Sequence, residues 1–189
     1  MNNTAAVTAA THPSVRTAGT AATYPSVVTA AQTQTVRRLI IPGLAAGAAF
    51  LGFEMLAGAP STSLWAFPQS IPQTVGLTAP TAALDPLALV LGVAIHLVFS
   101  VGLGLVFIAL AQRLGLRGTG RLLIAGALFM WAESGISIWA VIHTFFPSNM
   151  YILFGAVPFW ASFVGRTGFG LILAALYARM WTATAPSSK

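Results

Sequence analysis

Residues 87–112 read LALVLGVAIHLVFSVGLGLVFIALAQ, an apolar stretch in which His96 is the one side chain that can carry a charge. At about 1.5 Å of rise per residue, a helix of this length is longer than the roughly 30 Å hydrocarbon core of a bilayer. Three further apolar stretches occupy residues 39–58, 122–143 and 157–181. The sequence therefore predicts an all-α polytopic membrane protein with four transmembrane helices.

The composition agrees with a membrane protein. Hydrophobic residues make up 57% of the chain and charged residues 6%, whereas soluble domains carry about 25% charged residues. The net charge of +6 would suggest nucleic acid in a soluble protein, but here the basic residues lie mainly at the ends of the apolar stretches, where they orient helices in a bilayer. We expect the lipid bilayer, and not nucleic acid, to be the partner. With no cysteine, disulfides and thiolate metal sites are excluded.

The distribution of basic residues predicts the orientation. If the chain crosses four times, the Lys and Arg residues at or beyond the ends of the spans fall on one side, and the opposite loops have none. By the positive-inside rule, we expect both termini to be cytoplasmic. The residues on the cytoplasmic side are Arg16, Arg37, Arg38, Arg113, Arg117, Arg121, Arg179 and Lys189.

The remaining segments divide the chain further. Residues 1–36 are rich in Ala and Thr without an apolar stripe, which predicts a disordered cytoplasmic tail; a mitochondrial or chloroplast transit peptide would need more Arg. The transmembrane domain covers residues 37–181, and residues 182–189 form a second tail. The outer loop 60–86 contains several Pro residues, so we expect no helix to persist through it. Its Trp65 and Phe67 are candidate contact residues for a partner, or rest on lipid.

The spans also show an internal repeat. Residues 121–126 echo residues 38–43, and residues 166–177 echo residues 96–107 at six positions. Because the paired spans run in the same direction, the two copies form parallel-repeat helix pairs related by an axis along the membrane normal.

Away from its ends, each span carries one residue that can bear a full charge: Glu54, His96, Glu133 and Arg166 in chain order. Helical spacing puts each on a stripe of small or polar residues, and small residues allow close helix approach, so the stripes should face the bundle interior. Counted at about 1.5 Å per residue from the nearest cytoplasmic Arg, all four lie about 18–26 Å deep. An isolated charge in hydrocarbon is unfavourable. We therefore predict that Arg166 bonds Glu133, Glu54 or both, and that His96 completes the cluster.

Three roles remain open for this cluster. It can hold the helices in register, it can exchange a proton, or it can bind metal. Two carboxylates face one Arg, so one carboxylate is protonated unless His96 is charged. No Glu-x-x-His pair typical of di-iron bundles follows either Glu, so no metal or cofactor is expected. Supporting polar residues on the same stripes are Ser100, Ser137 and Ser162.

The pattern resembles an uncharacterised family of small four-helix bacterial inner-membrane proteins, a domain of unknown function. The resemblance covers about residues 38–180 and rests on the loop residues Trp65, Pro68, Ile71, Gly76 and Asp85, the run His96, Ser100, Gly104, and Phe146-Pro147. Members often carry a second His in the last helix, where this chain has Arg166. The resemblance implies the fold and a multi-pass location in the cell inner (plasma) membrane of a bacterium, and it implies no substrate.

These observations favour a non-enzymatic subunit or helper that binds other membrane proteins or itself. The alternative is a proton-linked small transporter or channel that uses the ionisable cluster. The sequence has no nucleophile elbow and no metalloprotease helix, so an enzyme is not expected.

Overall fold

The computed structural model describes residues 26–182, and for residues 26–35, 138–139 and 181–182 it describes the backbone alone. In this part of the chain all regular structure is helical. Four helices are long and apolar enough to cross a membrane: Val36–Gly58, Pro86–Arg113, Thr119–Phe145 and Phe159–Met180. The four long apolar helices expected from the sequence are confirmed, with ends that differ by a few residues.

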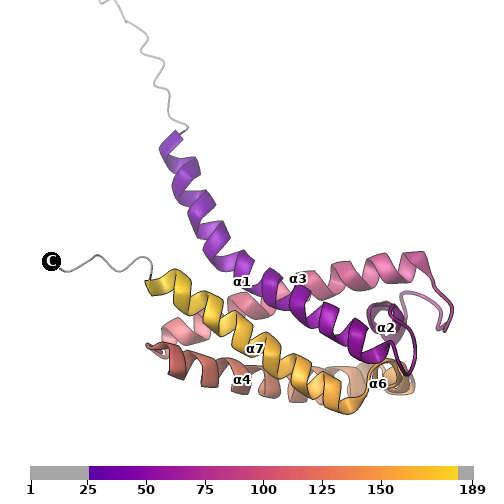
Figure 1. Ribbon diagram of the computed structural model, residues 1–189. Coiled ribbons are helices and arrows are strands. Elements are labelled where there is room, and N and C mark those ends of the chain that lie inside the picture. The colour runs from indigo at the N-terminus through magenta and orange to yellow at the C-terminus, as the bar shows by residue number, and fades with distance from the viewer. Residues whose placement is uncertain (1–25, 183–189) are drawn as a thin grey trace, which may run out of the picture.

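The long helices lie side by side in the order α3, α1, α7, α4 (Figure 1). Helix α1 (Ser26–Gly58) packs against both α3 (Pro86–Arg113) and α7 (Phe159–Thr182). Helix α4 (Thr119–Ser134) packs along α7 and continues as the π-helix η1 (Gly135–Ile142) and the single turn α5 (His143–Phe145). Short helices η2 (Pro147–Asn149) and α6 (Met150–Ala156) then lead into α7.

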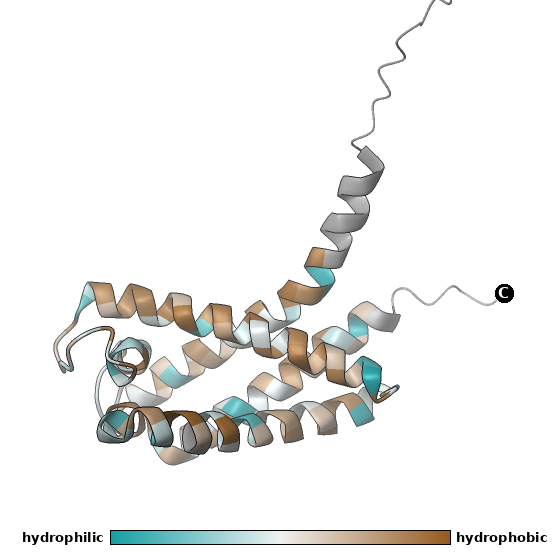
Figure 2. Ribbon diagram, turned by 180° about the vertical axis from the view of Figure 1, so that it is seen from behind, coloured by the Kyte–Doolittle hydropathy of each residue, from teal (hydrophilic) through white to brown (hydrophobic). Residues whose placement is uncertain are grey.

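Most of the apolar side chains of these helices lie on the outside of the bundle. Between 19% and 39% of the most apolar window of each long helix is buried inside the molecule. Large side chains such as Leu56, Val98 and Phe159 are 70%, 73% and 81% exposed. Hydrophobic colouring dominates the middle of the helices in Figure 2. A surface of this kind is stable in lipid and would drive association in water.

Helix α1 begins earlier than expected. It starts at Ser26, so the predicted disorder is wrong for residues 26–36, while residues 1–25 and 183–189 of the two expected tails lie outside the described residues. Residues 26–36 contain no Pro or Gly. Adding residues to an existing helix is much easier than nucleating one, so the apolar span can carry its helix back through this segment.

The outer loop contains a helix that was not expected. Helix α2 (Ala66–Thr74) forms in spite of two internal prolines and is almost entirely buried. Pro68 is the third residue of the helix, where its missing N–H would have no partner in the helix anyway. Because Pro72 has no N–H, the Pro68 carbonyl lacks its usual donor in the helix. Gly92 of α3 packs so closely on this carbonyl that no side chain would fit at position 92. The expectation that no helix persists through this loop is therefore wrong for residues 66–74.

Two buried glutamines attach α2 to the following loop. Gln69 donates from Nε2 to the Ala83 carbonyl at 3.1 Å and accepts from the Asp85 N–H at 2.8 Å. Gln73 donates to the Thr81 carbonyl at 3.4 Å. Asp85 then caps α3, accepting from the N–H groups of residues 87 and 88 at 2.9 and 3.1 Å. Because these bonds satisfy buried polar groups, the segment can lie inside the molecule.

Candidate functional site

Two helix crossings bring the ionisable residues inside the bundle. In the first, Gly43 and Gly47 of α1 meet Ser100 and Gly104 of α3 so closely that a side chain at either α1 glycine would collide with α3. In the second, Gly126 of α4 meets the backbone of Gly170 of α7, and each leaves no room for a Cβ on the other. The glycine stripes of α1 and α3 are buried, as the helical spacing predicted.

Arg166 of α7 bonds α4. Its Nη1 lies 3.1 Å from Glu133 Oε2, and the same nitrogen donates to Ser134 Oγ at 3.1 Å. The Glu133 side chain is 9% exposed and the Arg166 side chain 19%. A third polar bond joins the two helices close by, where Trp131 Nε1 donates to Thr167 Oγ1 at 3.0 Å. The acid and the base thus compensate each other across the α4–α7 interface.

His96 of α3 makes its side-chain hydrogen bond to the backbone of α1. Its Nε2 lies 3.0 Å from the Gly47 carbonyl oxygen, which requires a proton on that nitrogen for a hydrogen bond. The ring is buried against Phe50 of α1 and Phe67 of α2, with ring centroids 5.3 and 5.9 Å away. Ser100 supports the same turn by donating to the His96 carbonyl at 2.7 Å. No hydrogen bond joins the His96 side chain to Glu54, Glu133 or Arg166.

Glu54 of α1 lies between the two helix pairs. It is fully buried, and neither carboxyl oxygen has a hydrogen-bond partner among the described residues. The carboxyl packs on the α7 backbone at Gly165, where a Cβ would come within 2.8 Å of Glu54 Oε1. The Arg166 guanidinium and the Ser162 hydroxyl of α7 lie close enough to the Glu54 carboxyl to interact with it electrostatically. Within the described part of the chain, Glu54 is thus the carboxyl of the cluster that makes neither an ion pair with Arg166 nor a hydrogen bond.

The other predicted residues make no hydrogen bond to the Arg166–Glu133 pair. Ser162 is half-buried beside Glu54, and Ser137 is half-buried within η1 without a hydrogen bond to the ionisable residues. The prediction that Phe67 is an exposed contact residue is wrong, because α2 turns it inward and leaves it 7% exposed. Trp65 is half-buried, and its indole Nε1 is buried without a hydrogen-bond partner in the described part of the chain.

Sequence reasoning missed two residues at the centre. Ser134 accepts a hydrogen bond from the Arg166 guanidinium beside Glu133, and Gly165 leaves room for the Glu54 carboxyl. Ser134 adjoins Glu133, and Gly165 adjoins Arg166. That adjacency is the one signal in the sequence that could have indicated them. No group of three or more His, Asp or Glu side chains within residues 36–180 is arranged to hold a metal ion.

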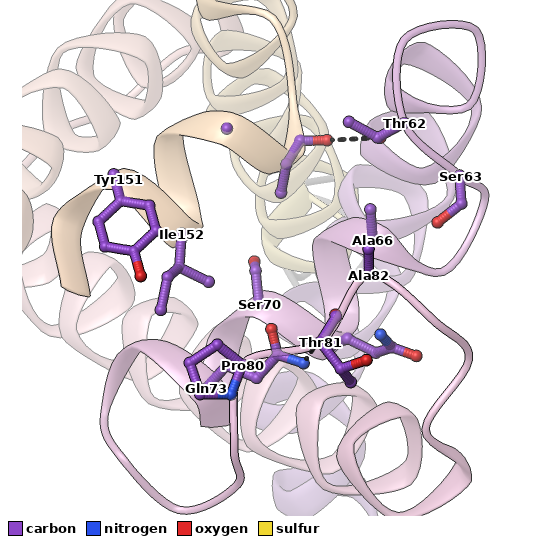
Figure 3. A pocket seen from close by; sticks show the side chains of 13 residues that line it. Thr62, Ser63, Ala66, Ser70, Gln73, Pro80, Thr81, Ala82, Tyr151 and Ile152 are labelled. Atoms are coloured by element: carbon purple, nitrogen blue, oxygen red, sulfur yellow. Dashed lines mark hydrogen bonds between the residues drawn. The ribbon is translucent and has the colours of Figure 1, made fainter.

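Two cavities lie near the end of the bundle that contains α2 and α6. The first, of about 440 Å³, lies between α2, the loop that follows it, and α6. Figure 3 shows Gln73 and Thr81 on one side of it and Tyr151 and Ile152 of α6 on the other. The second, of about 380 Å³, is lined mainly by aromatic and aliphatic residues of α4, η1, α6 and α7, with Arg166 in its wall. It is therefore the cavity that reaches the ion pair.

Comparison with family models, curated proteins and solved structures finds no match for this chain.

Proposed function

We propose that the protein is a small non-enzymatic membrane subunit or helper of the bacterial inner membrane, with four crossings and both termini in the cytoplasm. The four long helices alternate in direction along the chain, so the starts of the first and third spans lie at the same end of the bundle as the ends of the second and fourth (Figure 1). Most of the basic residues lie at or near these four helix ends. All the basic residues of these ends are exposed, and the two opposite connections, residues 60–86 and 146–158, contain no Lys or Arg. This asymmetry supports the orientation by the positive-inside rule. The exposed basic residues are Arg37, Arg38, Arg113, Arg117, Arg121 and Arg179.

The observation that carries the subunit proposal is the Arg166–Glu133 pair. The cation and the carboxylate bond each other and Ser134, and so hold α4 on α7. His96 likewise bonds a backbone carbonyl of α1 and so joins α1 and α3. Polar groups that bond one another across helix interfaces specify helix pairing, which is a structural role.

The same contacts support two repeated helix pairs. In the repeat inferred from the sequence, Gly43 corresponds to Gly126, and Ser100 to Gly170. A Cβ at Gly43 would meet the Ser100 carbonyl oxygen at 2.7 Å, and a Cβ at Gly126 would likewise meet the Gly170 carbonyl oxygen. The pairs are not equivalent in their surroundings, since α1 packs closely on α7 while α3 and α4 contact each other only lightly. We therefore propose a repeat of packed helix pairs without full two-fold symmetry.

A surface for partners lies at the outer end. Large aromatic side chains are exposed there on α5, α6 and the start of α7: Phe145 at 70%, Tyr151 at 68%, Phe159 at 81% and Trp160 at 59%. Aromatic residues are enriched both in protein interfaces and in the interfacial belt of membranes. Another membrane subunit or a second copy of this chain would cover this surface, which we call the outer aromatic surface.

Cross-linking in the native membrane tests this proposal. A photoreactive amino acid at position 159 should form one reproducible adduct with a defined membrane protein or a second copy, and the adduct should be recovered when the partner carries the tag. The same amino acid at the lipid-facing position Val98, which is 73% exposed, is the control. Lipid adducts alone from both positions, together with a solitary monomer in mild detergent, would overturn the proposal.

A second function, a proton-linked small transporter or channel, is favoured by Glu54. Its buried carboxyl has no donor and no ion-pair partner among the described residues, so it is the group of this cluster best placed to gain and lose a proton. Such a carrier shows pH-dependent flux in liposomes that Glu54→Gln abolishes. Asp85→Asn, which changes an acid at the cap of α3 outside the cluster, is the control. Flux that Glu54→Gln leaves unchanged would eliminate this function.

A further inference from the structure

The cavity beside the ion pair combines a polar wall with aromatic walls. Three polar residues line it, and the other lining residues are glycine or apolar. The polar residues are Ser134, Ser162 and Arg166, and the aromatic residues are Phe67, Trp131, Phe154, Phe159 and Phe163. Trp131, Phe154 and Phe163 are 48%, 45% and 47% exposed on the outer surface of the bundle. A lipid-soluble molecule could therefore enter sideways from the bilayer.

Arg166 has unused donors at this cavity. A guanidinium group has five N–H donors, and both hydrogen bonds of Arg166 use Nη1. Its Nε and Nη2 make no hydrogen bond to any described residue, and neither atom is fully buried. Hydrocarbon offers no water to satisfy such donors, and leaving them unpaired is costly. A ligand that fits this cavity should therefore supply hydrogen-bond acceptors.

The local charges decide which acceptor is suitable. Glu133 already neutralises Arg166, and the Glu54 carboxyl lies within interaction range of the same guanidinium. A further carboxylate or phosphate would add a negative charge to this group in a medium of low dielectric constant. A neutral carbonyl oxygen accepts from Arg166 without that repulsion.

We propose that this cavity binds a neutral, lipid-soluble compound with ring carbonyl groups, such as an alkyl quinone. A volume of about 380 Å³ accommodates one ring and the first part of an alkyl chain. The Trp131 and Phe163 rings, with centroids 4.7 Å apart, offer apolar faces to a flat ring. The π-helix η1 begins at the lining residue Gly135, and π-helical segments are frequent at functional sites. This inference does not depend on the subunit proposal, because it concerns a ligand and not a protein partner.

Photolabelling of the full-length chain in nanodiscs tests the site. The probe is an azido-benzoquinone with a decyl chain, and its adducts are mapped by mass spectrometry. We expect adducts within residues 131–135 and 154–163, removed by excess decyl-benzoquinone. Decylbenzene, which lacks the carbonyl groups, and oleate, which carries an anionic head, should each require at least about tenfold higher concentrations, corresponding to one missing set of hydrogen bonds or one unfavourable charge.

Two glycine variants make the test independent of folding. A Cβ at Gly135 or at Gly155 meets no atom within 4 Å, and the two glycines line different cavities. Gly135→Leu should fill the proposed site and remove at least nine-tenths of the labelling, whereas Gly155→Leu should leave the labelling unchanged. Equal labelling of both variants, or equal competition by decylbenzene, would show apolar partitioning only. Stronger competition by oleate would show an anionic-lipid site, and any of these outcomes would overturn the proposal.

Discussion

The α1–α3 and α4–α7 pairs are packed alike and bonded differently. Both cross at glycines that bring the two backbones into contact. The α4–α7 pair adds an ion pair between Arg166 and Glu133, whereas the α1–α3 pair adds a hydrogen bond between His96 and the Gly47 carbonyl. Losing a neutral hydrogen bond destabilises a protein modestly. Leaving an ion without its partner in hydrocarbon destabilises it strongly. The comparison teaches that equal helix packing can leave one pair far more sensitive to the loss of a single side chain.

The largest expected effect follows from removing one member of the ion pair. Glu133→Ala leaves the Arg166 guanidinium inside the bundle without its carboxylate, so the free energy of unfolding should fall by about 3–5 kcal/mol. Denaturant unfolding in micelles, followed by circular dichroism, measures this loss. The double variant Glu133→Leu/Arg166→Met removes both charges and should recover most of it. If the double variant is no more stable than Glu133→Ala, the charge compensation argued here is wrong.

The next effect tests the packing that the pairs share. Gly170→Ala places a Cβ on the backbone of Gly126, which cannot move aside as a flexible side chain could. The resulting overpacking should cost about 1–3 kcal/mol of unfolding free energy in the same assay. Gly168→Ala on the same helix meets no atom within 4 Å and is the matched control, which should be neutral or slightly stabilising. Equal effects of the two substitutions would rule out a backbone contact at this crossing.

The smallest effect concerns the neutral bond of the α1–α3 pair. His96→Phe keeps a ring against Phe50 and Phe67 and removes only the hydrogen bond to Gly47, so we expect a loss of about 0.5–1.5 kcal/mol. The unfolding assay used for Glu133→Ala allows direct comparison. A loss as large as that of Glu133→Ala would mean that the two helix pairs do not differ in the way described.

Part of the candidate site could be predicted because helical periodicity is local. The positions of Glu54, His96, Glu133 and Arg166 on their spans, and the burial of the glycine stripes of α1 and α3, follow from spacing alone. Which groups bond was not predictable to the same degree. Four ionisable residues at similar depth permit several pairings, and the choice depends on helix rotation and on gaps such as the one at Gly165.

By itself the sequence determined that this chain has four long apolar helices. The reason is that the length and the mean hydropathy of a membrane-spanning helix are properties of one continuous run of residues. Only the tertiary structure decided that Pro68 and Pro72 belong to a buried helix, that Phe67 turns inward, and that the Glu54 carboxyl has no hydrogen bond among the described residues. Those features depend on contacts between residues far apart in the chain. Gly92 and Gly165 show the physical reason. Each lacks a side chain, and a group from another helix occupies the space: the Pro68 carbonyl at Gly92 and the Glu54 carboxyl at Gly165. The local sequence around a glycine does not show which group will pack against it.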